Sequence, residues 1–181
     1  SDQAGEATET ADKAVGLPEG NPATLAEWAQ LEVSGGQLRV LNGAIPYTLN
    51  SALFSDYAHK LRTVWMPGGT SADYHATDTF DFPVGTIISK TFYYPRLLGG
   101  GPDDMLNQEI DITRPLDLTA VRLIETRILV RREDGWDALP YVWNAAQTDA
   151  TLKRIGAIIP LTLASGDTQT PFNYLVPNQN Q

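Results

Sequence analysis

The residues best able to do chemistry lie in the second half of the chain, where Glu125 and Arg127 stand two positions apart. In an extended strand, side chains two positions apart point to the same side of the sheet, roughly 7 Å from each other. A carboxylate and a guanidinium so placed either form one wall of a ligand site or make a structural salt bridge. Charged residues are rarely buried unless paired, which favours the salt bridge, although perturbed charged groups also gather at functional sites.

The surrounding residues 121–144 predict a β-hairpin that contains this pair, VRLIETRILVRREDGWDALPYVWN. Its central dipeptide, Asp134-Gly135, favours a two-residue type I′ turn, because both loop positions of that turn require a positive φ. With this loop, Asn144 lies across from Glu125. One face then carries mostly apolar side chains and ends in an ion pair: Ile124, Thr126, Ile128 and Val130 opposite Trp143, Tyr141 and Leu139, then Arg132 with Asp137.

Three more polar side chains join the predicted binding set. Lys90 stands among apolar neighbours on an expected strand, so it either extends its ammonium to solvent or pairs with an acid such as Glu125. Asn50 and Asp56 belong to an ordered loop, residues 46–58, whose polar side chains either bond to the local backbone or contribute to a site. The candidate binding residues are therefore Asn50, Asp56, Lys90, Glu125, Arg127 and Asn144.

Composition excludes several kinds of chemistry. The chain has no cysteine and two histidines, His59 and His75, which excludes disulfides, covalent haem attachment within the chain and a histidine-rich metal site. A general acid and base drawn from Asp56, Glu125 and Lys90 is conceivable, but no spacing in the chain forms a catalytic motif. We therefore expect no catalytic residue, no metal site and no cofactor held by the chain itself.

Charge and hydropathy narrow the range of partners. The formal net charge is −9, which disfavours nucleic acid, since phosphate binding requires clustered Lys and Arg. The chain lacks an apolar run of about eighteen residues, so we expect no transmembrane helix. Residues 1–20 are acidic and poor in apolar side chains, which predicts a disordered tail that can tether the folded domain to something upstream.

Further strand patterns recur at residues 60–66, 85–95, 155–163 and 169–176, with turn residues between them. Thr24 and Glu27 form a capping-box pattern, which predicts a short helix that ends at about Leu31. Together these patterns predict an all-β fold, an antiparallel β-sandwich or partly open barrel with one or two short helices. Residues 21–181 are expected to form this single domain, which ends in a linker-like tail, PNQNQ.

Four blocks of sequence follow one another in order: PYTLNSALFSDYAHKLRTVWMP, FDFPVGTIISKTFYYP, RLIETRILVRREDGWDALPYVWNAAQTDATL and NYLVPNQNQ. Together they resemble the region preceding the haem domain in a family of bacterial diheme c-type cytochromes of undefined reaction. The resemblance spans residues 25–181. In such proteins a tail like VPNQNQ is followed directly by a CxxCH haem-attachment motif. The resemblance thus implies an exported domain, periplasmic or extracellular, with haem c in a downstream region rather than in this chain.

The resemblance also implies a function and partners. The expected function is a non-catalytic accessory or interaction domain of an exported electron-transfer protein, which packs against the haem domain of the same polypeptide or against a redox partner. The alternative is a ligand-binding β-sandwich, for carbohydrate, since four tryptophans and seven tyrosines supply stacking surfaces. Two exposed, coplanar aromatic rings would favour the alternative. A deep polar pocket lined by Lys90, Glu125 and Arg127 would argue against an accessory domain.

Overall fold

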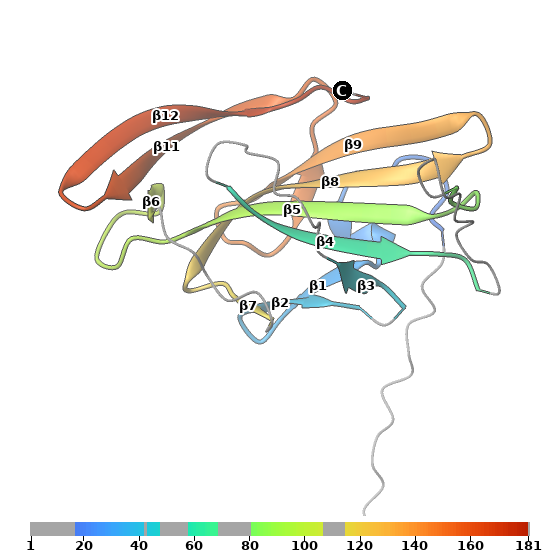
Figure 1. Ribbon diagram of the computed structural model, residues 1–181, viewed down its shortest axis with the longest axis horizontal. Coiled ribbons are helices and arrows are strands. Elements are labelled where there is room, and N and C mark those ends of the chain that lie inside the picture. The colour runs from blue at the N-terminus through green and yellow to red at the C-terminus, as the bar shows by residue number, and fades with distance from the viewer. Residues whose placement is uncertain (1–16, 42, 48–57, 69–80, 107–114, 181) are drawn as a thin grey trace, which may run out of the picture.

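The computed structural model describes residues 17–41, 43–47, 58–68, 81–106 and 115–180. Strands make up most of this part of the chain, and its one helix is a short 3-10 helix, η1 (Leu25–Trp28). The strands form three sheets that pack as layers (Figure 1). The predicted all-β, mainly antiparallel sandwich is confirmed. Two predicted site residues, Asn50 and Asp56, lie outside the described residues.

The middle layer is a six-stranded sheet in which every pairing is antiparallel. Its long central strands are β5 and β8, which come from the two stretches richest in β-branched and aromatic residues. In spatial order the sheet consists of β10 (Ala150–Leu152), β9 (Gly135–Trp143), β8 (Val121–Arg132), β5 (Ile87–Pro95), β4 (His59–Trp65) and β3 (Ile45–Tyr47).

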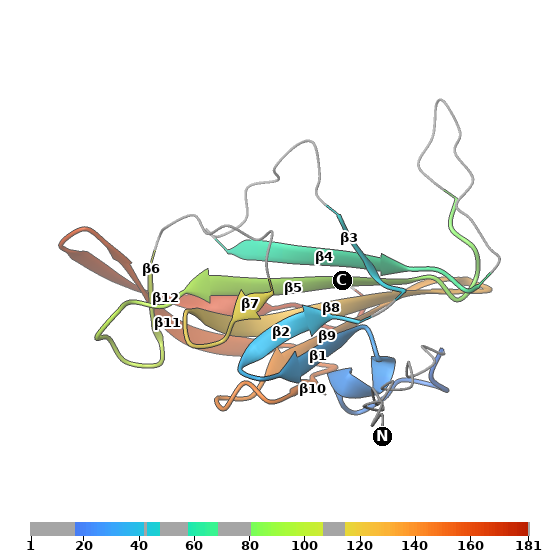
Figure 2. The same cartoon turned by 90° about the horizontal axis from the view of Figure 1, so that it is seen from below.

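Two smaller sheets cover opposite faces of this middle layer (Figures 1 and 2). One consists of β1 (Leu31–Ser34), β2 (Gln37–Val40) and β7 (Leu116–Asp117), and packs with η1. The other consists of the hairpin β11 (Ala157–Ser165) and β12 (Thr168–Val176), with β6 (Asp104–Leu106) at its edge. The β6–β11 pairing is parallel. The middle sheet is therefore buried on both faces over much of its area.

The core under η1 is the larger of the two. Trp28 is fully buried in it, and its indole Nε1 donates a 2.7 Å hydrogen bond to the Tyr141 hydroxyl, which donates in turn to the carbonyl oxygen of Pro22. Hydroxyls on the same face of the sheet bond across strands, Thr63 with Ser89 and Thr91 with Thr126. Each of these buried indole and hydroxyl groups thus has a hydrogen-bond partner.

The hairpin of residues 121–144 is present, but its register differs from the prediction by two positions. The loop residues are Glu133 and Asp134, because Arg132 pairs with Gly135. A shift of two does not by itself move a side chain to the other face, since side chains alternate with a period of two. The predicted Arg132–Asp137 ion pair is confirmed, at 3.4 Å between Nε and Oδ2.

One side chain of the predicted core face changes sides because of a β-bulge in β8. Phe92 pairs with Glu125 and Tyr93 with Leu123, which leaves Ile124 as the extra residue. Ile124 therefore packs under the β11–β12 hairpin, and Leu123 enters the core under η1. The prediction placed Ile124 on the core face and Leu123 on the other face, the reverse of what is observed.

The N-terminal helix is shorter than predicted. It ends at Trp28, where Ala29 adopts a left-handed conformation with φ 54°. Leu31 already begins β1, and Gly35-Gly36 forms the β1–β2 turn instead of ending a helix. The capping interaction is present, since the Thr24 backbone N–H donates to Glu27 Oε2 at 3.2 Å. Within the described residues, no helix has the length and apolarity needed to cross a membrane.

The C-terminal segment, predicted to be linker-like, lies along the sheet as far as Asn180. The Asn180 backbone N–H donates to the carbonyl oxygen of Ala138, and its side-chain oxygen accepts from the Ala138 N–H, both at 2.9 Å. The Gln179 backbone N–H donates to the carbonyl oxygen of Arg154 at 2.8 Å. The segment thereby pairs both backbone groups of Ala138 on the β9 edge, beyond the end of β10.

Candidate functional site

A row of polar side chains crosses the middle sheet on the face that the β11–β12 hairpin partly covers. Strand register sets Arg62 opposite Lys90, and Lys90 opposite Arg127. Tyr47 on β3 extends the row beyond Arg62, and Pro140 on β9 ends it beyond Arg127. Directly opposed residues have Cβ atoms about 5 Å apart, so three cations stand side by side. We call Arg62, Lys90 and Arg127 the basic row.

Glu125, one row closer to the β11–β12 hairpin, neutralises the charge of Arg127 at one end of the basic row. Glu125 is fully buried, and its Oε1 accepts from Arg127 Nε at 3.0 Å and Nη2 at 2.6 Å. The hydroxyl of Tyr174, from β12, donates to the same oxygen at 2.6 Å. The guanidinium also lies over Phe92, 4.4 Å from the ring centroid. The predicted Glu125–Arg127 salt bridge is confirmed, and the hairpin completes it.

The electrostatics of this cluster follow from its burial. Burial works to lower the pKa of Arg127, but the hydrogen bond and charge of Glu125 outweigh it and raise that pKa. Burial, reinforced by the Glu125 carboxylate, raises the pKa of the Tyr174 phenol. Both groups therefore hold their protons throughout the physiological range.

Lys90 sits at the centre of the basic row without a carboxylate partner among the described residues. Its pKa is lowered mainly by burial, and the positive charges of Arg62 and Arg127 lower it further. The ion pair between Lys90 and Glu125 that the sequence left open is not among the ion pairs of the described residues, in which Glu125 pairs with Arg127. The Lys90 side chain is half-buried, which is consistent with an ammonium that extends towards solvent.

Two buried polar atoms near the row lack a hydrogen-bond partner within the described structure: Arg62 Nε and Glu125 Oε2. A buried polar atom without a partner costs about 1–3 kcal/mol. Arg62 was not predicted as a site residue. Its alternation with Lys60 on one strand was a signal, but only the β4–β5 register shows that it stands next to Lys90.

A small pocket of about 80 Å³ opens beside Lys90 and Arg127. Pro177 and Asn178 of the C-terminal segment form part of its wall, together with Leu129 and Pro140. Small-molecule sites usually measure about 300–1,000 Å³. The pocket is therefore too small for a whole metabolite, and Glu125 does not line it.

Beyond the basic row, the same face of the sheet carries a row of apolar side chains, Val64, Ile88 and Leu129. All three are half-buried, and none of them belongs to either core of the described structure. The hairpin core instead takes Phe92, Ile124 and Val142 from this sheet. This half of the face, from the basic row to Leu129, is thus incompletely covered by the described elements.

Asn144 does not join the cluster, and the prediction that it lies across from Glu125 is wrong. Glu125 pairs with Val142, which moves Asn144 beyond the pairing because of the two-residue register shift. The Asn144 side chain instead closes the turn that follows β9, donating to Thr148 Oγ1 at 2.8 Å and accepting from the Thr148 backbone N–H at 2.9 Å. It is a structural turn residue.

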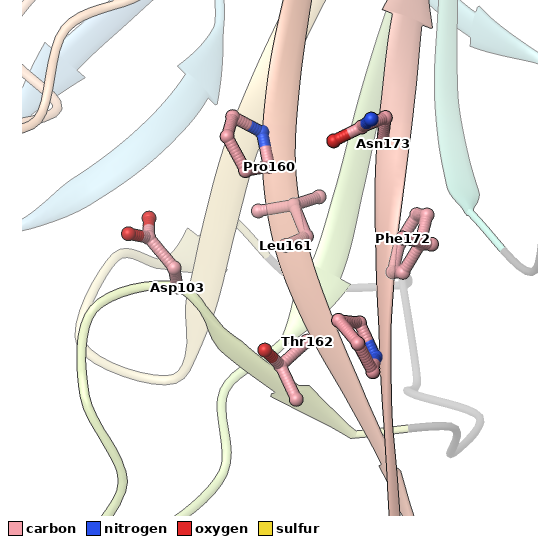
Figure 3. A pocket seen from close by; sticks show the side chains of 7 residues that line it. Asp103, Pro160, Leu161, Thr162, Phe172 and Asn173 are labelled. Carbon is pink, nitrogen blue, oxygen red and sulfur yellow. The ribbon is translucent and has the colours of Figure 1, made fainter.

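A second, shallow groove of about 370 Å³ runs along the outer side of the β11–β12 hairpin (Figure 3). Pro160 on β11 lies between the Asp103 carboxylate and the Asn173 amide, whereas the Phe172 ring points to the other side of β12 and packs against Tyr94. The groove therefore combines apolar surface with a few hydrogen-bonding groups.

The aromatic side chains are mostly interior. Among the described residues, Trp136 is the single aromatic residue more than a third exposed, at 41%. Its ring meets Phe82 edge to face, at an interplanar angle of 83°. No pair of exposed, coplanar rings occurs in the described ranges. In the same ranges, no group of three or more His, Asp or Glu side chains is arranged to hold a metal ion.

Comparisons with known proteins give no relative. No family model, no curated protein and no solved structure matches the chain.

Proposed function

We propose that this chain is a non-catalytic interaction domain of an exported electron-transfer protein of the c-type cytochrome kind. The observation that carries the proposal is the incompletely covered half of the middle sheet, where the basic row borders Val64, Ile88 and Leu129. Apolar sheet faces rimmed by charged groups are typical of protein–protein contacts. The resemblance to the region before a haem domain supplies the nature of the partner.

The C-terminal segment supports a contact at this place. Pro177 and Asn178 lie beside Lys90 and Arg127, and Asn180 is hydrogen bonded to β9. A haem domain that followed this segment, as the resemblance implies, would begin close to the incompletely covered half of the sheet. The segment would then act as a short, fixed connection, and the effective concentration of the two domains would be high.

The polar cluster supports a role other than catalysis. Glu125 is the buried acid of the site, and its Oε1 already accepts three hydrogen bonds, from Arg127 and Tyr174. A general acid or base needs a substrate proton within hydrogen-bond reach, and the pocket beside Lys90 is small. The triad is thus better suited to fastening the hairpin than to proton transfer.

The first test is the intact mass and visible absorption spectrum of the protein produced in its native host. A Soret band with a mass well above 19.8 kDa is the expected result. A colourless protein of 19.8 kDa would overturn the proposal, because no haem domain would be attached to it.

A second test locates the contact. Ile88→Glu places a charge on the incompletely covered face, and should abolish the retention of the β domain by the haem domain after the connection between them is cleaved. The matched control is Ile158→Glu, at a residue that is 67% exposed on the outer side of β11. Equal loss with both variants, or with neither, would contradict a contact at the middle sheet.

The groove of Figure 3 favours one alternative function, the binding of a carbohydrate. Apolar surface with a few hydrogen-bonding groups, here an amide and a carboxylate, is typical of small-molecule sites. Asn173→Ala should then abolish retardation in affinity electrophoresis through soluble polysaccharides, whereas Asn144→Ala, at an exposed turn, should leave it unchanged. Absence of retardation of the wild-type chain by every polysaccharide would remove this alternative.

A further inference from the structure

We infer that the basic row, Arg62, Lys90 and Arg127, binds an oxyanion, a carboxylate or a phosphate group, centred on Lys90. The inference rests on the proposed function in one respect: a partner domain is one source of that group. A free anion is the other source, and the site is the same for both.

The first argument is the juxtaposition of like charges. Arg62 and Arg127 stand directly opposite Lys90 on its two sides, and directly opposed like charges destabilise a sheet. The chain as a whole has a formal net charge of −9, so a local concentration of cations is contrary to its composition. An anion among the three side chains would turn this repulsion into attraction.

The second argument is the shortage of acids within reach. Glu125 neutralises Arg127, while burial and the neighbouring cations lower the pKa of Lys90 and no carboxylate acts against them. The described part of the chain therefore leaves about two positive charges of the row without a counter-charge.

The third argument is an unused donor. Arg62 Nε is buried and has no hydrogen-bond partner in the described structure. A guanidinium donates in a planar fork that matches a carboxylate or a phosphate. An oxyanion held at Lys90 that also reached Arg62 would accept from this donor, which would remove the cost of a buried donor without a partner.

The size of the site indicates what part of a ligand it takes. The pocket beside Lys90 and Arg127 measures about 80 Å³, against about 300–1,000 Å³ for sites that enclose a small molecule. The pocket thus accommodates one oxyanion group on the Arg127 side of Lys90, with the rest of its carrier outside. Arg62 does not line the pocket and borders Lys90 on the other side. A carboxylate that projects from a protein surface meets this description, as does one group of a free polycarboxylate.

The test uses the purified chain with citrate and inorganic phosphate as probes, at constant ionic strength with chloride as the reference. We expect the thermal midpoint to rise with probe concentration, since a ligand that binds the folded state stabilises it by mass action. Lys90→Gln and Arg62→Gln should each raise the dissociation constant, measured by calorimetry, by about tenfold or more. This is the loss in affinity expected when a hydrogen bond to a charged group is removed.

Two controls separate the site from general charge effects. Lys153→Gln and Arg39→Gln remove the same charges from exposed positions elsewhere, and should bind both probes as the wild type does. The readout is the change on adding the probe, so a shift in the baseline stability of a variant does not interfere. Equal binding by Lys90→Gln and the wild type, or equal loss in the controls, would overturn the inference.

A third probe distinguishes the two sources of the oxyanion. Tighter binding of a polyglutamate peptide than of citrate and phosphate, lost in Lys90→Gln, would support a partner's carboxylates. Binding of citrate or phosphate without the peptide would support a free anion. No binding of any probe overturns the site. The native mass and spectrum test the interaction-domain proposal separately, so either idea can fail without the other.

Discussion

Tyr174 and Glu125, 49 residues apart in the chain, are joined by a hydrogen bond of 2.6 Å between the phenolic hydroxyl and carboxylate Oε1. The bond ties the C-terminal hairpin to the middle sheet, at a point where Glu125 is fully buried. Arg127 donates to the same oxygen. One carboxylate thereby links a strand of the middle layer to the layer that covers it.

Removing the Tyr174 hydroxyl should destabilise the domain. Tyr174→Phe leaves a buried carboxylate with one donor fewer, and a hydrogen bond to a charged group contributes about 1.5–3 kcal/mol. Urea unfolding followed by tryptophan fluorescence measures the loss. Tyr93→Phe is the control, because the Tyr93 hydroxyl is buried without a partner among the described residues, and its removal should be neutral or stabilising. A Tyr93→Phe variant less stable than Tyr174→Phe would contradict this account.

Neutralising Glu125 should cost more than neutralising the acid of the other ion pair. Glu125→Gln leaves Arg127 without its counter-charge, and we expect a loss of about 3 kcal/mol, the lower end for a buried pair, because Arg127 keeps 29% of its side chain exposed. The control is Asp137→Asn, whose pair with Arg132 is more exposed and should be worth less than about 1 kcal/mol. Equal losses in urea unfolding would show that burial of Glu125 does not matter.

Stability should fall steeply above pH 10. Burial raises the pKa of Tyr93 from its ordinary value of 10.0 to about 12. The folded chain keeps a proton that the unfolded chain releases in this interval, so the stabilisation is complete below pH 10 and is lost as pH rises towards 12. The slope for one such group is about 1.4 kcal/mol per pH unit.

The measurement for this prediction is the difference in unfolding free energy between wild type and Tyr93→Phe from pH 9 to 12, in which the titration of Lys90 and of the other tyrosines cancels. The difference should grow more favourable to Tyr93→Phe through the interval. A difference that is flat with pH would mean that the Tyr93 phenol ionises as freely in the folded chain as in the unfolded one.

Gly156 should be far less replaceable than Gly166. Both have positive φ, 75° and 60°, a region that costs a residue with a Cβ about 1–2 kcal/mol. A Cβ at Gly156 would also lie 2.3 Å from the carbonyl oxygen of Val176, whereas nothing lies within 4 Å of one at Gly166. We expect Gly166→Ala to lose about 1–2 kcal/mol and Gly156→Ala to lose several, in the same unfolding assay. Similar losses would show that the backbone at Val176 moves aside easily.

The alternation of side chains made the faces of the central hairpin predictable, but not its register. An Asp-Gly turn sets Glu125 opposite Asn144, whereas the loop that forms, Glu133-Asp134, sets it opposite Val142. Both registers bury the same face, because they differ by an even number. Nothing in the periodicity separates them, and the misplacement of Asn144 follows from this degeneracy.

The basic row depends on contacts between distant segments, which local pattern does not contain. Arg62 and Lys90 meet through the β4–β5 register, and Tyr174 reaches Glu125 from the last strand. The Ile124 bulge is equally a property of two strands together, since it appears only where β8 pairs with β5. The Glu125–Arg127 pair was predictable because both residues lie on one strand.

The pairing of Asn180 with Ala138 has a kinetic consequence. Synthesis proceeds from the N-terminus, so β8 and β9 are complete long before β12 and the segment up to Asn180 leave the ribosome. Until then Glu125 lacks the Tyr174 hydroxyl, and the Ala138 end of β9 is an unpaired edge open to other strands. Within this domain, the strand and segment made latest are thus the ones that close it, and a nascent or truncated chain remains prone to aggregate up to that moment.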